Sequence, residues 1–140
     1  MNSLQSHMEL DGCAVADLYC GSGALGIEAL SRGAASCVFV DSDPRAVKAT
    51  IDNLERTHLA QLATVVQRDV AGWLDGAPPL DVVLADPPYD FVGWESLLVT
   101  VNSSWVVTES DRELSVASGW ELRRSRRYGT TWVQLLQRSV

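Results

Sequence analysis

The sequence predicts an α/β fold, a Rossmann-like, doubly wound, seven-stranded sheet that is mostly parallel and ends in an antiparallel C-terminal hairpin. Short apolar runs alternate with helix-like segments along most of the 140 residues. This alternation is typical of a parallel sheet covered by helices on both faces. A glycine-rich loop follows the first apolar run, and the last two strand-like runs flank a Gly-Thr turn. Such a turn predicts a hairpin.

The first unit is a strand, a glycine loop and a helix. Val15–Tyr19 reads as the strand, residues 20–26 as the loop, and Ile27–Arg32 continues as the helix. The loop has the G-x-G-x-x-G pattern, which lets the backbone approach a ligand at a helix N-terminus. Its glycines are Gly21, Gly23 and Gly26.

The second unit begins with the apolar strand Cys37–Val40, which ends in Asp41. An acid about 20 residues after the glycine loop can accept hydrogen bonds from ribose hydroxyls. The two units together therefore indicate a nucleotide-type ligand. The glycine loop alone does not separate NAD from S-adenosylmethionine.

A helix is expected to follow, because Asp43 can cap it and Pro44 suits its first turn. It should end near His58, and three apolar residues are spaced to face the sheet: Val47, Ile51 and Leu54. The remaining elements are expected as strands at 63–67, 82–85, 105–109, 121–128 and 131–137, a short helix around Trp73, and a helix at 94–102.

Asp86-Pro87-Pro88-Tyr89 directly follows the apolar run 82–85. The prolines fix φ and lack an N–H, so the turn is stiff and its carbonyls point away from the sheet ladder. A carboxylate and a prolyl carbonyl can accept the two hydrogens of an amino group on a planar ring, and Tyr89 can stack on that ring. The alternative is a strand-ending turn with a surface tyrosine.

Composition predicts one globular domain, because 46% of the residues are hydrophobic and 21% are charged. Residues 1–10 read as a leader or tag remnant and residues 11–140 as the domain.

No apolar run is long enough to span a membrane. Three cysteines without a Cys-x-x-Cys pair and two histidines favour reduced thiols and no metal site. We expect a cytoplasmic monomer.

Charge is divided unevenly along the chain. The net charge is −7, yet residues 112–140 carry 6 basic and 2 acidic side chains. Four of the basic residues lie in Arg123-Arg124-Ser125-Arg126-Arg127. Such a cluster can bind phosphates. The alternative is a solvated strand face whose arginine stems cover apolar neighbours.

The chain resembles the class I S-adenosylmethionine-dependent methyltransferases, and most closely the bacterial 16S ribosomal RNA guanine-N2 methyltransferases of the RsmD type. The resemblance rests on Asp17–Ala34, on Asp86–Tyr89 and, more weakly, on Tyr128–Thr130. Cys20 stands where relatives usually have alanine. Relatives also carry a basic segment before the first strand, with an Arg-Pro-Thr-type stretch, and no such stretch precedes Val15.

The resemblance implies a site for S-adenosylmethionine. Asp17 and the glycine loop would hold the methionine part, Asp41 the ribose with Ser42 along the adenosine edge, and Asp69 with Val70 the adenine. The implied cofactor residues are Asp17, Tyr19, Gly21, Ser22, Gly23, Gly26, Asp41, Ser42, Asp69, Val70 and Asp86. Each acid has a plainer alternative. Asp17 could cap the loop, Asp41 could be an acid near a helix N-terminus that the helix dipole favours, and Asp69 could be a surface charge.

The resemblance also implies a reaction. The amine of guanine is a poor nucleophile because its lone pair is shared with the ring, so positioning by Asp86 and the carbonyl of Pro87 would direct that lone pair at the methyl group. Phe91 and Trp94 could extend the apolar wall. Catalytic roles fall to Asp86, Pro87 and Tyr89, and contacts with 16S ribosomal RNA or the small subunit to Pro88, Tyr89, Arg124, Arg126 and Arg127.

Three alternatives remain open from the sequence. An amino-methyltransferase could act on adenine N6 or on a glutamine amide, since Asp/Asn-Pro-Pro-Tyr turns serve both. An NAD-dependent oxidoreductase would use the glycine loop and Asp41 but leaves Asp86–Tyr89 unexplained. A cofactor-binding core without its RNA-gripping arm would bind the cofactor and transfer nothing.

Overall fold

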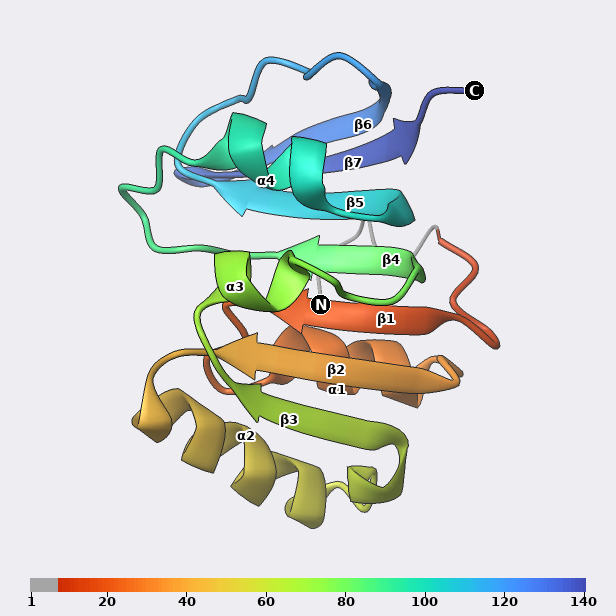
Figure 1. The fold of residues 1–140 in the computed structure, drawn as a ribbon, viewed down its shortest axis with the longest axis vertical. Helices are drawn as coiled ribbons and strands as arrows, with labels where there is room; N and C mark the ends of the chain where they lie inside the picture. Colours follow the sequence, from red (N-terminus) through yellow and green to blue (C-terminus); the bar gives the residue numbers. More distant parts are fainter. Residues whose placement is uncertain (1–7) are drawn as a thin grey trace.

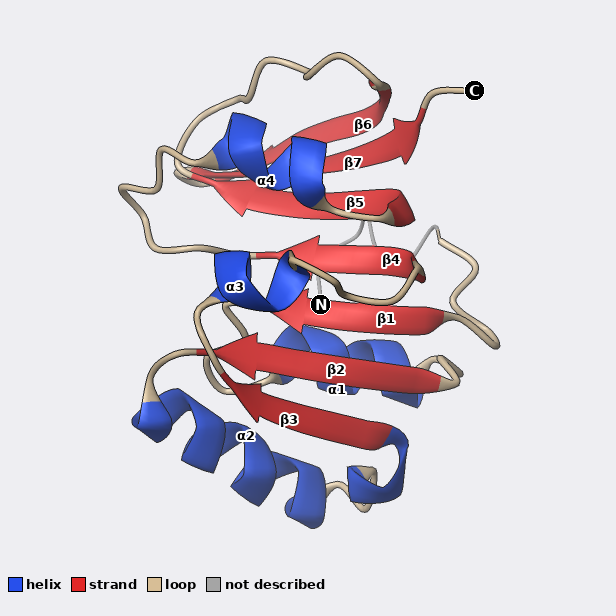
Figure 2. Cartoon of the chain, in the orientation of Figure 1, coloured by secondary structure: helices blue, strands red, loops and turns tan. Residues whose placement is uncertain are grey.

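A computed structural model describes residues 8–140, which form a seven-stranded sheet with helices on both faces (Figures 1 and 2). The strand order is β3-β2-β1-β4-β5-β7-β6. Strands β1 to β5 pair in parallel, whereas β7 is antiparallel to both β5 and β6. This confirms the predicted fold class. The strands are β1 (Ala14–Leu18), β2 (Ser36–Asp41), β3 (Ala63–Gln67), β4 (Leu80–Ala85), β5 (Ser103–Ser110), β6 (Trp120–Tyr128) and β7 (Thr131–Arg138).

The helices divide between the two faces of the sheet. The first two pack on one face and the last two on the other, where Figure 1 shows α3 and α4 in front of the strands and α1 behind them. No helix among residues 8–140 is long and apolar enough to cross a membrane. The helices are α1 (Ala24–Ser31), α2 (Pro44–Arg56), α3 (Val70–Leu74) and α4 (Trp94–Thr100), with a 3₁₀ turn, η2 (Ala60–Leu62).

The two faces of the sheet carry separate apolar clusters. Side chains of successive residues in a strand point to opposite faces, so Val83 packs toward α3 and α4 while Leu84 packs toward α1 and α2. Both are at most 1% exposed. Burial on both faces explains why β4 is an uninterrupted apolar run rather than an alternating one.

The first helix lies close against β2 because it carries a glycine at the contact. A Cβ at Gly26 would overlap the ring of Phe39 and lie 2.8 Å from the sulfur of Cys37. Gly23 precedes α1 with φ of 81°, a left-handed conformation that favours glycine. The two glycines therefore set the turn and the depth at which the helix begins.

The expected packing of α2 is wrong at one position. Ile51, predicted to face the sheet, is 41% exposed, whereas Thr50 is fully buried and its hydroxyl donates to the carbonyl of Gly21 at 2.8 Å. A backbone carbonyl with limited access to water needs a donor, and Thr50 supplies one to the half-buried Gly21. The glycine loop thus sets the rotation of α2.

The N-terminal boundary of the domain stays a prediction. Residues 1–7 of the expected leader lie outside the described residues. Leu10, also in that range, is 2% exposed and packs in the cluster on the α1 face.

Candidate functional site

Acidic side chains follow one another along the carboxyl edge of the sheet. Asp17 lies near the end of β1, Asp41 at the end of β2, Asp86 directly after β4 and Glu109 near the end of β5. The charges of Asp86, Glu109 and Asp41 all raise the pKa of Asp17. This edge therefore has a negative potential that suits a cationic ligand.

A pocket of about 280 Å³ opens between the glycine loop and this edge. Two of its lining residues are acidic and none is basic, so the negatively charged diphosphate of a dinucleotide would meet repulsion there. Five residues expected at a cofactor site meet in its wall: Asp17, Tyr19, Gly21, Ser22 and Asp86. Cys20, Ala24 and Leu25 complete the lining.

Gly23 and Gly26 shape the loop from behind the pocket wall. The N–H of Gly23 donates to the carbonyl of Cys20 at 2.8 Å and closes the turn. The N–H of Gly26 donates to Asp17 Oδ2 at 2.9 Å. Gly23 and Gly26 therefore stabilise the conformation of the loop and do not line the pocket themselves.

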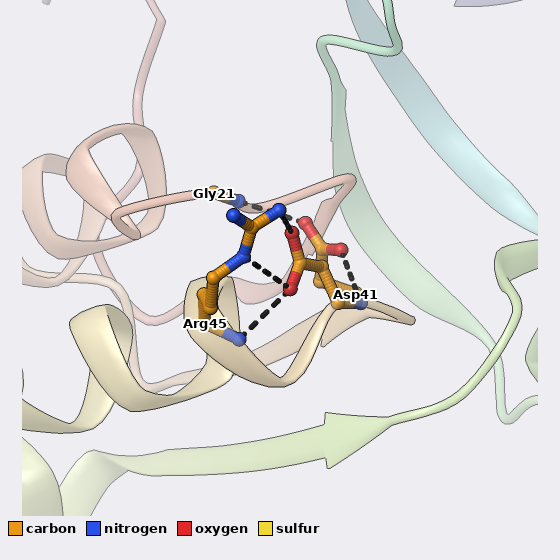
Figure 3. A network of polar contacts seen from close by, with 4 residues as sticks. Gly21, Asp41 and Arg45 are labelled. Carbon is orange, nitrogen blue, oxygen red and sulfur yellow. Dashed lines mark hydrogen bonds and ion pairs between the residues drawn. The ribbon is translucent and has the colours of Figure 1, made fainter.

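Asp41 ties the loop to the start of α2 (Figure 3). One of its carboxylate oxygens accepts from the N–H of Gly21 and the other from the N–H of Asp43, each at 3.0 Å. Asp43 in turn caps α2 by accepting from the N–H of Arg45 at 2.9 Å, and it pairs with the Arg45 guanidinium at 3.2 Å. These bonds hold Asp41 against Gly21, which lines the pocket, although Asp41 is not itself among the lining residues. Ser42 beside it is exposed.

Asp17 is a buried carboxyl, 1% exposed. Burial is the main cause that raises its pKa from 3.8 to about 8, although the hydrogen bond from Gly26 opposes the shift. No cationic side chain among residues 8–140 forms an ion pair with this carboxyl, and it lines the pocket. It is suited to the ammonium group of a ligand.

Replacing Asp17 by asparagine should stabilise the ligand-free protein at alkaline pH. The folded-state pKa lies above the unfolded one, so the folded protein binds more protons between about pH 4 and pH 8, and stability falls as pH rises through that range. The asparagine side chain can still accept from Gly26 but does not ionise. Urea denaturation across this range should therefore show the difference in unfolding free energy between D17N and the wild type increasing with pH.

The same substitution should weaken binding of S-adenosylhomocysteine, because the ammonium loses its carboxylate. Asp81, an exposed acid near the opposite end of the sheet, provides the matched control as D81N. A pH-independent stability difference between D17N and wild type would contradict this account of Asp17.

A second pocket, of about 180 Å³, lies beside Tyr19 on the face covered by α3 and α4. Its wall is mainly apolar, and Phe91 meets Tyr19 edge to face at 5.5 Å and Trp94 at 5.3 Å. Tyr19 lines this pocket as well as the glycine-loop pocket. A ligand could therefore extend from one pocket to the other.

The residues expected around adenine lie at the start of α3, next to this pocket. Asp69 caps α3 by accepting from the N–H of Gly72 at 3.4 Å. Burial, and then the charge of Asp69, raise the pKa of Tyr19. Val70 is 2% exposed and its side chain packs in the core, so only its backbone can serve a ligand.

The Asp86-Pro87-Pro88-Tyr89 turn lines a third pocket, of about 250 Å³, with Asp86, Pro87 and Tyr89 in its wall. Tyr89 is 74% exposed. The carbonyl of Pro88 accepts from the N–H of Phe91 at 2.9 Å and is thus used within the turn. Asp86 lines both this pocket and the glycine-loop pocket, so it stands between two possible ligands.

Burial raises the pKa of Asp86, and a side-chain hydrogen bond with Glu109 partly opposes that shift. Glu109 lines the third pocket together with Ser110, Asp111 and Thr131. Sequence reasoning missed Glu109, although it follows an apolar strand in the same way as Asp41 and Asp86. That position at the carboxyl end of a strand was the signal that could have found it.

The arginine cluster lies on β6, the edge strand, and divides between its two faces. Arg124 and Arg126 pair with Leu135 and Val133, which belong to the cluster on the α1 face. Arg127 pairs instead with Trp132, and its Nε donates to the carbonyl of Gly129 at 2.8 Å.

Arg123 is also engaged locally, with Gln137 and Glu121, each at 2.7 Å. The structure therefore brings Arg124 and Arg126 together and places Arg127 apart from them.

No group of three or more metal-ligating side chains forms a metal site within residues 8–140. The three cysteines are free thiols, and burial raises the pKa of Cys20 to about 12. Its sulfur lies 3.4 Å from the Thr50 hydroxyl. Cys20 lies in the glycine loop and Cys37 against Gly26, whereas Cys13 precedes β1.

The family model described as "Conserved hypothetical protein 95" matches residues 1–137. YlbH of Bacillus subtilis (strain 168), provisionally named an rRNA methyltransferase, is 32% identical over 142 residues, covering 91% of this chain and 77% of YlbH. The structure of yhhF from Escherichia coli, provisionally named a methyltransferase, superposes with a TM-score of 0.83 at 29% identity, covering 94% of this chain and 78% of that one.

A shorter match is to the ribosomal protein L11 methyltransferase of Xanthomonas campestris pv. campestris (strain 8004). It is 43% identical over 70 residues, which is 49% of this chain but only 23% of that protein. The family model and YlbH, by contrast, match most of the chain, and the pocket geometry is consistent with them. The chain belongs to the family described as Conserved hypothetical protein 95 and is a class I S-adenosylmethionine-dependent methyltransferase of the RsmD type.

Proposed function

We propose that this protein transfers a methyl group from S-adenosylmethionine to the exocyclic N2 amine of a guanine in 16S ribosomal RNA, in the cytoplasm. The observation that carries the proposal is the position of Asp86, which lines both the glycine-loop pocket and the pocket of the Pro87–Tyr89 turn. A methyl donor in the first pocket and an amine in the second would meet at this carboxyl. The name of YlbH supports an RNA substrate.

The residues present fit S-adenosylmethionine. Asp17 suits its ammonium, Asp41 is held beside Gly21 of the glycine-loop pocket and would accept from the ribose hydroxyls, and the pocket lined by Tyr19 and Phe91 suits a planar ring. Asp69 and the backbone of Val70 border the same region. When bound, the cofactor supplies an electrophilic methyl group on a sulfonium, whose positive charge matches the acidic edge of the sheet.

The work of this chain's own residues is to present the amine. Asp86 and the carbonyl of Pro87 accept its two hydrogens, which favours a pyramidal nitrogen with its lone pair available. Tyr89, largely exposed, provides a stacking surface for a base that has left its stack. Pro88 holds the turn rigid.

The backbone of the RNA needs a cationic surface. Arg124 and Arg126 lie on the face of β6 shared with Val133, and Val133 pairs with Glu109 at the edge of the third pocket. Arg124 and Arg126 therefore lie on the same face of the sheet as Glu109. In the proposed complex they would contact the phosphates beside the target base.

Replacing Arg124 and Arg126 together by alanine should weaken binding of 16S ribosomal RNA and reduce its salt dependence. Two lost phosphate contacts lower the slope of log K against log salt by about two. Binding measured by fluorescence anisotropy at several salt concentrations tests this, and affinity for S-adenosylhomocysteine should not change. The control is R127A, because Arg127 pairs with Trp132 and lies on the other face. A loss in R127A as large as that in the double variant would overturn the assignment of the face.

Transfer of a radioactive methyl group tests the proposed substrate class. Protein-free 16S transcript, assembled small subunits and ribosomal protein L11 serve as parallel acceptors. We expect label in RNA from one or both RNA-containing samples and none in the separated protein. Label confined to protein would contradict an RNA substrate, and no label in any acceptor with intact cofactor binding would support the binding-only alternative.

A further inference from the structure

The segment of residues 86–93 joins β4 to α4 and contributes to the walls of two pockets, yet it contains no helix or strand. Its first residue, Asp86, lines the third pocket, whereas Phe91 lines the pocket of about 180 Å³ beside Tyr19. Within the segment, the N–H of Phe91 donates to the carbonyl of Pro88 at 2.9 Å. A segment without a regular hydrogen-bond ladder depends for its conformation on contacts from other parts of the chain.

Arg112, in the loop after β5, makes such a contact from 21 positions further along the chain. Its Nη2 donates to the carbonyl of Phe91 at 3.1 Å, and its Nη1 lies 2.8 Å from Oδ1 of Asp111. The hydroxyl of Ser110 donates to the carbonyl of Arg112, which ties the arginine backbone to the end of β5. The backbone of Phe91 is therefore engaged at both polar groups, its N–H by Pro88 and its carbonyl by Arg112.

The guanidinium of Arg112 also connects the two pockets. Asp111 lines the third pocket, and its side chain is 22% exposed, against 48% for that of Arg112. A guanidinium presents its N–H groups in a fixed plane, so it can hold a carbonyl and a carboxylate at the same time in defined directions. The link therefore runs from Asp111 in the wall of one pocket to Phe91 in the wall of the other.

We infer that Arg112 is a positioning residue that fixes the segment of residues 86–93 to the end of β5. It keeps Phe91 in place beside Tyr19 and Asp86 in place at the third pocket. Its consequence in catalysis rests on the proposed function. The alternative for a half-exposed arginine is a contact with an RNA phosphate, which predicts a loss of RNA affinity alone.

Amide hydrogen exchange measured by NMR tests the link in the ligand-free protein. In R112A the N–H of Phe91 should exchange at least about threefold faster than in the wild type, because the segment opens more often once the carbonyl loses its charged donor. R112K should show a smaller increase, since lysine keeps the charge but has no planar fork.

R32A is the matched control for the exchange experiment. The side chain of Arg32 is 39% exposed and forms an ion pair with Glu28 at 3.1 Å on α1. Its removal should leave the exchange of the Phe91 N–H unchanged. Wild-type exchange of this N–H in R112A, or an equal acceleration in R32A, would overturn the inference.

Calorimetry and single-turnover methylation test the consequence. We expect R112A to raise the Kd of S-adenosylhomocysteine about three- to tenfold and to lower the rate at saturating cofactor and RNA about tenfold, with R112K between R112A and the wild type. The affinity for RNA and its salt dependence should match the wild type.

The opposite pattern would identify a phosphate contact. Weaker RNA binding in R112A, with a salt slope lower by about one and an unchanged cofactor affinity, would overturn the positioning role. Faster exchange and weaker cofactor binding in R112A, beside a wild type that methylates no RNA, would support the link and reject the proposed function alone.

Discussion

Replacing Asp86 by alanine is expected to reduce methyl transfer at least about 10²–10³-fold, the usual loss when an essential polar group at the reacting centre is removed. Asp86 is the residue that lines both the cofactor pocket and the pocket of the Pro87–Tyr89 turn. Without it, the carbonyl of Pro87 is left as the sole predicted acceptor for the amine. Single-turnover rates with saturating cofactor measure the effect directly.

Affinity for S-adenosylhomocysteine should change little in the same variant, because Asp86 forms only one side of the glycine-loop pocket. D86N is the matched second variant, since its side-chain oxygen can still accept one hydrogen but carries no charge. It should fall between alanine and the wild type. Near-normal turnover in D86A would contradict the assigned role of this turn.

Replacing Asp41 by alanine should reduce the affinity for S-adenosylhomocysteine by at least about 100-fold. The loss corresponds to about 3 kcal/mol, from hydrogen bonds between a carboxylate and ribose hydroxyls that are each worth about 1.5–3 kcal/mol. The variant also loses the bonds from the N–H groups of Gly21 and Asp43 that hold the glycine loop (Figure 3). Calorimetric titration measures the affinity, and thermal unfolding measures the structural part.

D43N is the matched control for Asp41. Asparagine caps a helix as well as aspartate does, and its backbone N–H still donates to Asp41. This variant removes the Arg45 ion pair, which is exposed and contributes little to stability. Binding that is unchanged in D41A, or lost equally in D43N, would show that Asp41 does not hold the ribose.

The elements that carry the site could be predicted because each combines a burial pattern with a local motif. Asp41 and Asp86 both follow apolar runs, and parallel strands bring their carboxyl ends to one edge of a sheet. The glycine pattern located the turn into α1. The glycine pattern could not predict the rotation of α2. That rotation depends on the hydrogen bond from Thr50 to the Gly21 carbonyl, and these residues are 29 positions apart in the sequence.

The faces of the arginine strand could not be predicted either. Strict alternation would place Leu122 and Arg124 on the same face of β6. An irregularity in the pairing between these two residues shifts the register, so Leu122 pairs with Leu136 on the α4 face and Arg124 with Leu135 on the α1 face. A bulge of this kind reverses every side chain beyond it. In a polar edge strand such as β6, a bulge has no clear signature in the sequence.

Mass spectrometry of nucleosides is the measurement that tests the central claim most directly. Ribosomal RNA from small subunits incubated with the protein and S-adenosylmethionine would be digested and compared with the same reaction using D86A. The account predicts one new methylated nucleoside, N2-methylguanosine, present with the wild type and absent with D86A. N6-methyladenosine in its place, or N2-methylguanosine at equal yield with D86A, would contradict it.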